Sequence, residues 1–340
     1  MPQPASPAEI KPAATILLLR DDPAFEVLMV KRHHQIDFAS GALVFPGGKS
    51  HAGDTDRNWE AHTVGWEAYD AEQRTLRIAA IREVFEEAGI LLARRRDGQP
   101  MSGEACPMDV RLAVDAGTTR FIDVVSRLDA YLDLDALTVF ARWITPPLTP
   151  KRFDTWFYAV NAPLEQLAAC DGRETVDAEW IAPAEALRLA AAGERKVIFP
   201  TRMNLQLLAE ASGAADAVAR AAARTLVTVQ PQIQQREGGR VLVLPPTPAT
   251  ARWPSRWKTS CDAGLAGRKH DQSLSCAGGA RLVSLRKSKE PGHAPRLSAR
   301  RRHHHRRAGY RFSPDGHADR QVHLRGPAWR REDHHPPGTG

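Results

Sequence analysis

The chain has 340 residues, of which 42% are hydrophobic, enough for one ordinary domain with an extension or for two domains. Its net charge is +7, but residues 241–340 hold 20 Lys and Arg against 7 Asp and Glu. The first 240 residues are therefore acidic, with a net charge of −6. The basic balance belongs to the C-terminal part of the chain, so it does not indicate what the remainder binds.

Features of secreted and membrane proteins are missing from the sequence. No apolar run approaches the ~20 residues that a bilayer span needs, and the first residues lack the basic-then-apolar order of a signal peptide. The four cysteines, Cys106, Cys170, Cys261 and Cys276, lie far apart and form no C-x-x-C pair. This spacing favours free thiols over a disulfide framework or a zinc knuckle. We therefore expect a cytoplasmic protein that does not bind membranes.

The N-terminal part of the chain is typical of a hairpin that follows a disordered leader. Residues 1–12 are rich in Pro and Ala and are expected to be the leader. Residues 15–20 and 26–32 are two β-prone runs separated by the turn sequence DDPAF. This arrangement predicts two paired antiparallel strands.

The clearest helix is predicted over residues 76–88. Its apolar residues recur at helical spacing, and Gly89 stands where a left-handed cap would end the helix. Residues 55–75, just before it, are largely polar and show no clear period. We therefore expect them to be an inserted loop.

Strands and helices continue to alternate further along. The sequence predicts a strand over residues 153–160, a helix from Pro183 to Gly193, and a second helix from Thr201 through Arg224. Alternation of this kind over residues 13–240 indicates one α/β domain.

The composition changes near residue 245. Residues 241–340 contain 20 Pro and Gly but only 13 Leu, Ile, Val and Phe, too little apolar surface to offset chain entropy. Residues 245–340 are therefore expected to be a basic, low-complexity tail without a fold. The run RRHHHRR at residues 301–307 leaves open a weak affinity for nucleic acid or acidic lipid. The abrupt change also suits an extension translated out of frame.

Three glutamates stand out on the predicted helix. Glu83, Glu86 and Glu87 are spaced i, i+3 and i+4, so their carboxylates share one face. Like charges at this spacing destabilise a helix by ~0.2–0.5 kcal/mol per pair, which a bound cation would offset. Oxygen ligands favour Mg²⁺ or Mn²⁺ over zinc. The alternative is an ordinary solvated acidic face.

The residues around these glutamates resemble a known motif. The segment REVFEEAGI, residues 82–90, resembles the second half of the Nudix box, R-E-U-x-E-E-x-G-U with U aliphatic. Gly48 and Asp54 resemble its first half, G-x5-E, with Asp in place of Glu. The 27 residues between the halves, 55–81, make a long insertion. Such an insertion is similar to that of the Nudix hydrolase branch that includes the peroxisomal coenzyme A diphosphatase.

This resemblance implies a fold and a set of ligands. The expected fold is an α/β/α sandwich with a mixed β-sheet, spanning residues 13–240. Arg82 would orient the first glutamate, and Glu179 is the substitute should Glu174 not be a ligand. The implied metal ligands are the Gly48 carbonyl, Glu83, Glu86, Glu87 and Glu174.

The chemistry of diphosphate hydrolysis suits this donor set. The reaction needs a nucleophilic water and neutralised charge on the phosphate oxygens, and carboxylates holding a divalent cation can supply both. A carboxylate that is not tightly ligated can take the proton of the water as general base. Glu83 and Glu174 are the alternatives for that role.

The substrate class is indicated by residues upstream of the box. The segment LMVKRHHQIDFASGALVFPGG resembles the pattern L-L-T-x-R-S-x3-R-x3-G-x3-F-P-G-G of a coenzyme A subgroup at Arg32, at Gly41 and at FPGG. The second arginine of that pattern is Asp37 here. Arg32 and Arg152 are predicted phosphate contacts, with solvated surface arginines as the alternative.

Together these features predict a Mg²⁺- or Mn²⁺-dependent Nudix hydrolase. Its expected substrate is a nucleoside diphosphate linked to another moiety, with free or acyl coenzyme A as the leading class. The alternative function is a non-catalytic module of the same fold that binds a nucleotide, or RNA through the tail. The sequence does not indicate an oligomeric state.

Overall fold

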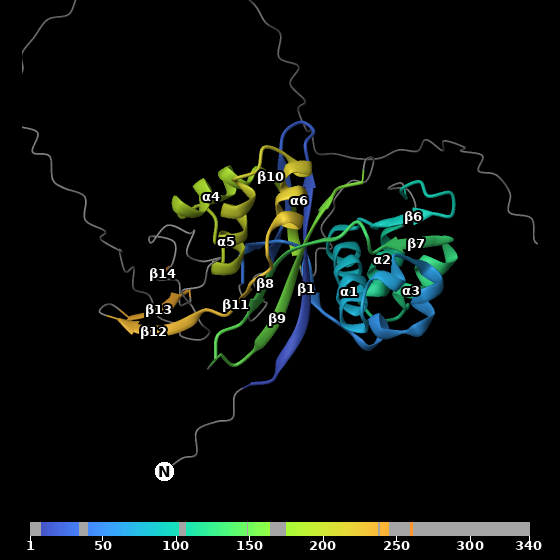
Figure 1. Ribbon diagram of the computed structural model, residues 1–340, viewed down its shortest axis with the longest axis horizontal. Coiled ribbons are helices and arrows are strands. Elements are labelled where there is room, and N and C mark those ends of the chain that lie inside the picture. Colours follow the sequence, from blue (N-terminus) through green and yellow to red (C-terminus); the bar gives the residue numbers. More distant parts are fainter. Residues whose placement is uncertain are drawn as a thin grey trace, which may run out of the picture. The chain divides into compact units, whose positions relative to one another are not determined.

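The computed structural model describes residues 8–33, 40–101, 107–147, 149–163, 175–236, 239–244 and 259–260. A mixed sheet lies at the centre of these residues, with helices on both of its faces (Figure 1). Its main strands follow the order β10-β2-β1-β9-β8-β11, while β3 pairs with β2 and β4 pairs with β1. These strands are β1 (Ile10–Arg20), β2 (Glu26–Arg32), β3 (Leu43–Val44), β4 (Gly47–Lys49), β8 (Thr138–Ile144), β9 (Arg152–Asn161), β10 (Thr175–Ile181) and β11 (Thr228–Val229).

Two smaller sheets flank the central one. The first has the order β5-β7-β6 and the second β12-β13-β14. Their strands are β5 (Thr63–Val64), β6 (Ala93–Arg95), β7 (Ala130–Asp133), β12 (Gln232–Arg236), β13 (Gly239–Val243) and β14 (Thr259–Ser260). The helices are α1 (Ala71–Ala88), α2 (Met108–Asp115), α3 (Phe121–Arg127), α4 (Pro183–Ala191), α5 (Phe199–Leu208) and α6 (Ala214–Ala223), with short 3-10 helices η1 (Ala52–Thr55), η2 (Arg57–His62) and η3 (Trp66–Ala68).

Strand β1 shows how the sheet separates two hydrophobic cores. Its side chains alternate between the faces, as they do in any strand. Ile16 and Leu18 enter the core that contains α1, whereas Leu17 and Leu19 enter the core that contains α5 and α6. Helices therefore cover both faces, and the predicted α/β/α sandwich with a mixed sheet is confirmed.

The predicted hairpin and helix end are present. Strands β1 and β2 pair antiparallel through Leu19 and Val27. Gly89 ends α1 with φ 74° and donates its N–H to the Phe85 carbonyl, as a left-handed cap does. The strand β1 begins earlier than expected, at Ile10 in the predicted leader, because its first residues pair with β9.

Two helices differ from the prediction in their bounds. Helix α1 begins at Ala71 because the Asp70 side chain accepts the N–H of Gln73 at 2.8 Å and so caps the helix. The helix expected from Thr201 through Arg224 is divided into α5 and α6. Gly213 stands directly before α6, and such a residue lowers the cost of breaking a helix.

The segment predicted as an inserted loop is folded. It contains η2 and η3, and its strand β5 pairs with β7. Trp59 is 1% exposed, packs with Phe121 at a ring distance of 5.6 Å, and donates its indole N–H to the Gly53 carbonyl at 2.9 Å. Gly65, at φ 84°, lies against Asp135, where any side chain would overlap the carboxylate. The insertion therefore packs beside α1.

The predicted tail, residues 245–340, lies outside the described residues apart from Thr259 and Ser260, which pair with β13. Within the described part of the chain, no helix has both the length and the apolar character that crossing a membrane requires.

Candidate functional site

The candidate site lies on helix α1 and on the turn that carries β4. The helix is buried from Leu76 to Ala88, including its charged residues. Glu83, Glu86 and Glu87 are only 8%, 8% and 4% exposed. The alternative of a solvated acidic face does not describe these residues. Buried carboxylates need compensating charge or hydrogen bonds, and the surrounding residues provide them.

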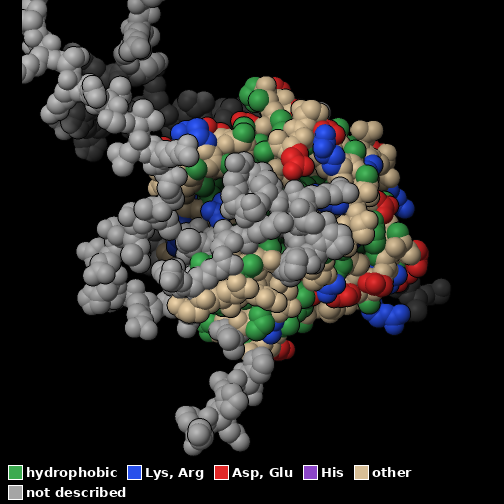
Figure 2. Space-filling model, turned by 60° about the vertical axis from the view of Figure 1, so that its left-hand side comes forward, with side chains coloured by type: hydrophobic (Ala, Val, Ile, Leu, Met, Phe, Trp, Pro, Cys, Tyr) green, Lys and Arg blue, Asp and Glu red, His purple; other side chains and the backbone are tan. Residues whose placement is uncertain are grey.

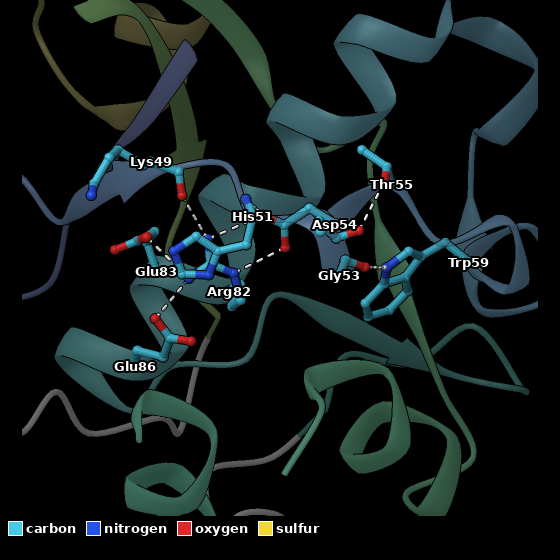
Figure 3. Close-up of polar contacts among 10 residues, drawn as sticks. Lys49, His51, Gly53, Asp54, Thr55, Trp59, Arg82, Glu83 and Glu86 are labelled. Carbon is cyan, nitrogen blue, oxygen red and sulfur yellow. Dashed lines mark hydrogen bonds and ion pairs between the residues drawn. The ribbon is translucent and has the colours of Figure 1, made fainter. Parts of the chain in front are cut away.

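Arg82 joins the acidic residues of the site (Figure 3). Its Nη1 lies 3.0 Å from Glu83 Oε1 and 2.8 Å from Glu86 Oε2. On the other side, Nε and Nη2 donate to the two carboxylate oxygens of Asp54 at 2.9 and 3.1 Å. Nη2 also donates to the Lys49 carbonyl at 2.8 Å. Burial alone would lower the pKa of Arg82, but the three carboxylates raise it above its usual value.

The glycine turn lies directly against the glutamates. A Cβ built on Gly48 would lie 2.5 Å from the carboxylate carbon of Glu83, so a side chain there would displace that carboxylate. The N–H of Gly47 donates to Glu87 Oε2 at 3.0 Å. The structure thus brings together Gly48, Arg82 and all three glutamates of the predicted site.

Burial is the main influence on the carboxyl group of Glu86. Burial raises its pKa to about 8, although Arg82 acts in the opposite direction and Glu83 and Asp115 add to the rise. A carboxylate in this state gains from a nearby cation, and its oxygens are the donors that Mg²⁺ and Mn²⁺ prefer. In donor chemistry and burial, the residues fit a hard divalent cation.

The side chains, as positioned, do not form a complete metal-binding cluster. Among the described residues, no three His, Cys, Asp or Glu side chains converge closely enough to hold a metal ion. Arg82 and the Gly47 N–H are hydrogen-bonded to one oxygen of each of the three glutamates. Metal binding by these glutamates therefore stays a prediction.

The fourth predicted glutamate, Glu174, lies outside the described residues. Its substitute, Glu179, is in β10 and lies 3.5 Å from Arg195 in an ion pair. Glu179 pairs with Met29, which belongs to the core on the face opposite α1. The structure therefore does not place Glu179 with the site, because alternation along β10 turns it away from the glutamates.

The two predicted phosphate contacts differ in their surroundings. Arg32 ends β2, and its Nε is buried with no hydrogen-bond partner in the described part of the chain. Arg152 is 8% exposed and donates its Nε to the Thr145 carbonyl at 3.3 Å. Arg152 is thus a buried residue that supports the turn before β9, while Arg32 retains an unsatisfied donor.

Arg111 of α2 is a residue of this site that the sequence analysis did not single out. It is 2% exposed and donates its Nε to the Glu86 backbone carbonyl at 2.7 Å. A cation at the C-terminal end of a helix stabilises the carbonyls that have no partner there. The signal that could have found it is a lone arginine among the apolar residues of the segment PMDVRLAV.

Comparisons with known proteins agree with this geometry. The model of the NUDT19 Nudix domain matches residues 70–206. The acyl-coenzyme A diphosphatase NUDT19 of Homo sapiens is 28% identical over 213 residues, covering 49% of this chain and 56% of that protein. The Xenopus laevis protein of the same name is 26% identical, covering 48% of this chain and 54% of that protein. The chain thus spans about half the length of these relatives.

A solved structure supports the same relationship. A NUDIX hydrolase from Alicyclobacillus acidocaldarius is 28% identical, with a TM-score of 0.54, and the match covers 62% of this chain and 96% of that one. One conclusion follows from the match in fold, from the box residues gathered around Arg82 and from the match to the family model. Residues 70–206 match a Nudix domain, and the chain resembles the Nudix hydrolases of the acyl-coenzyme A diphosphatase branch.

Proposed function

We propose that the protein hydrolyses a diphosphate linkage in a nucleoside diphosphate linked to another moiety, in a reaction that requires Mg²⁺ or Mn²⁺. The observation that carries the proposal is the packing of Glu83 against Gly48, with Arg82 joining Glu83 and Glu86 to Asp54. The similarity to proteins named acyl-coenzyme A diphosphatase supports it.

The residues that would hold the cation come from α1, the β4 turn and the segment before β10. They are the Gly48 carbonyl, Glu83, Glu86, Glu87 and Glu174. When bound, a divalent cation lowers the pKa of a water molecule and neutralises charge on phosphate oxygens. Glu83, Glu86 and Glu87 lie on one buried helix beside Gly48, so their side chains, and not the backbone, would adjust on binding.

The side chains have separate roles in the proposal. Arg82 is a positioning residue, because its guanidinium fixes the carboxylates of Glu83 and Glu86. A carboxylate near the attacking water accepts its proton as general base. Glu83 and Glu174 remain the two alternatives for that base.

The leading substrate class is free or acyl coenzyme A, because the segment before the box resembles a coenzyme A pattern and the relatives are named acyl-coenzyme A diphosphatases. Arg32 is the stronger of the two proposed phosphate contacts, since it is partly exposed and its Nε has no partner among the described residues. Arg152 is the weaker one, because its Nε is already bonded to Thr145. The proposed partner is thus a small molecule, and we expect the protein to act in the cytoplasm.

A substrate panel with the full chain tests the proposal. Free coenzyme A, an acyl coenzyme A and other nucleoside diphosphate derivatives are incubated with Mg²⁺, with Mn²⁺ or with a chelator, and the products are identified by mass. We expect cleavage to a nucleoside 5′-phosphate, which from coenzyme A is adenosine 3′,5′-bisphosphate, only with a divalent cation. The variant with both Glu86→Gln and Glu87→Gln should lose most of this turnover.

A matched control separates this effect from a general loss of acidic charge. Glu185→Gln removes an exposed helical glutamate of α4 that pairs with Arg188, and it should leave turnover unchanged. Full cation-dependent turnover in the double variant would reject the proposal. Nucleotide binding without any hydrolysis in the parent protein would favour the non-catalytic module instead.

A further inference from the structure

A second polar group lies on the central sheet, apart from the glutamates. The Arg142 guanidinium lies 4.6 Å from the centroid of the Trp156 ring. Its Nε and Nη2 donate to the two carboxylate oxygens of Asp154 at 2.9 and 2.6 Å. We name Arg142, Asp154 and Trp156 the β8–β9 cluster. Because both ends of the guanidinium fork are bonded, the cation is held in place over the indole.

The β8–β9 cluster lies on the same face of the sheet as Glu83. Across four adjacent strands, Gly48 pairs with Ala14, Ala14 with Trp156, and Trp156 with Arg142. Residues directly opposite one another in paired strands have their side chains on one face. The Cβ direction of Gly48 points at Glu83, and Ala14 belongs to the α1 core, against which Trp156 also packs.

The separation within this row suits a nucleotide. Neighbouring strands lie about 4.8 Å apart, which puts the backbone of Trp156 about 10 Å and that of Arg142 about 14 Å from Gly48. A nucleoside diphosphate places its base and its phosphates at opposite ends of a ribose, a span of similar length. A ligand with its phosphates at Glu83 therefore has the length to bring its base to the β8–β9 cluster.

The chemistry of the cluster favours a base over a further phosphate. Asp154 neutralises the charge of Arg142, so the stacked pair presents a flat polarisable surface with little net charge. Nucleobases stack on aromatic rings and on arginine planes. The Trp156 Nε1 is buried and has no hydrogen-bond partner among the described residues, so stacking, and not a hydrogen bond to this N–H, would hold the base.

We propose that Arg142, Asp154 and Trp156 bind the purine base of a nucleoside diphosphate whose phosphates lie at the Glu83 site. The inference rests on the proposed function for the position of the phosphates. It assigns recognition of the base end of the substrate to these three residues. The purine is favoured because its two fused rings match the area of the indole.

The chain contains a matched control for this cluster. Arg20 lies 4.3 Å from the centroid of the Trp180 ring and donates its Nε to Glu26 at 2.8 Å, which repeats the arrangement with a glutamate in place of the aspartate. Arg20 is six residues from Ala14 along β1, a distance of about 20 Å in a strand. The group of Arg20, Glu26 and Trp180 therefore has the same chemistry far from the glutamates.

Calorimetry with the full chain and Mg²⁺ tests the proposal. The probes are the α,β-methylene analogue of ADP, which resists hydrolysis, and methylenediphosphonate, which has the same bridge without a nucleoside. Trp156→Leu should weaken binding of the ADP analogue about tenfold and leave methylenediphosphonate binding unchanged. Trp156→Phe should lose less, because a phenyl ring still stacks. Trp180→Leu should change neither affinity.

Each of the other outcomes has a defined meaning. Unchanged binding of the ADP analogue in folded Trp156→Leu, or an equal loss for both probes, overturns the proposal. Should Trp156→Leu fail to fold, Arg142→Gln replaces it, with an expected loss of about threefold for the ADP analogue alone. If the variant loses affinity for the ADP analogue alone, and the parent protein hydrolyses no substrate, this site is upheld and the proposed function is rejected. If the parent protein hydrolyses its substrate, but Trp156→Leu does not change the affinity for the ADP analogue, the proposed function is upheld and this site is rejected.

Discussion

At Arg82, one guanidinium connects the two halves of the box across the long insertion. The half before the insertion contributes Asp54 and the Lys49 carbonyl, and the half after it contributes Glu83 and Glu86. A planar fork with five donors can satisfy these acceptors together, whereas a lysine ammonium cannot. Asp54, in place of the expected glutamate, still reaches Arg82 with both of its oxygens.

Loss of the Arg82 guanidinium should therefore destabilise the fold. Arg82→Met leaves buried carboxylates without their cation, a change that costs about 3–5 kcal/mol in comparable buried pairs. Chemical denaturation of the variant and the parent measures the difference in free energy of unfolding. Arg120→Met is the control, because Arg120 pairs with Asp123 at the surface and should leave stability nearly unchanged. Equal stability of the Arg82→Met variant and the parent would contradict this view of the site.

Gly48 allows a second prediction at the scale of a residue. In Gly48→Ala the new methyl group displaces the Glu83 carboxylate, and a shift of about 1 Å in a reacting group lowers kcat/KM by about a hundredfold. Steady-state kinetics on the substrate identified in the panel measures this loss. Gly53→Ala is the matched control, since a Cβ there meets nothing within 4 Å. Comparable kinetics in the two variants would show that the close approach of Gly48 to Glu83 is not needed.

At the scale of elements, the insertion supports the helix that carries the glutamates. Trp59 fills a buried position between η2 and α3, where it packs with Phe121. Phe121 in turn packs with Phe85 of α1 at a ring distance of 5.3 Å. The contacts therefore run from the insertion through α3 to the face of α1 next to Glu86.

The Trp59→Ala variant tests whether the insertion is structural. Removal of a fully buried indole should lower the free energy of unfolding by about 3–5 kcal/mol, because the cavity does not collapse fully. Urea denaturation measures this value, and Asn58→Ala, an exposed neighbour in η2, should change it little. A loss below about 1 kcal/mol for Trp59→Ala, the range of ordinary surface substitutions, would mean that the insertion is dispensable.

At the scale of the whole molecule, the elements with a periodic sequence pattern could be predicted, but the contacts between distant segments could not. The β1–β2 hairpin, the end of α1 at Gly89 and the acidic face of α1 follow from local spacing in the sequence. The folded insertion did not, because Trp59 is fixed by Phe121, a residue 62 positions later. The Arg111 contact and the row from Gly48 to Arg142 likewise depend on pairings between distant segments.

Charge is distributed unevenly between the described residues and the C-terminal part of the chain. On the face shown in Figure 2, acidic and basic side chains are interspersed over the described surface. Residues 272–340, in contrast, hold 15 Lys and Arg against 5 Asp and Glu in the sequence. Any strong attraction to nucleic acid therefore belongs to that segment, because affinity of this kind grows with the number of phosphates neutralised.

A chain ending at Asp271 separates the two functions that the sequence left open. It keeps every element of the described fold, including β14, and we expect its thermal midpoint and turnover to equal those of the full chain. Binding of single-stranded RNA at two salt concentrations, measured by fluorescence anisotropy, should be weak in both chains, with a salt-dependent part only in the full one. A full chain that binds RNA tightly, and loses hydrolysis together with that binding on truncation, would instead make the basic segment part of the active protein. Retained turnover in the shorter chain assigns the hydrolysis to residues 1–271 alone. Every proposed metal ligand and the β8–β9 cluster precede residue 182.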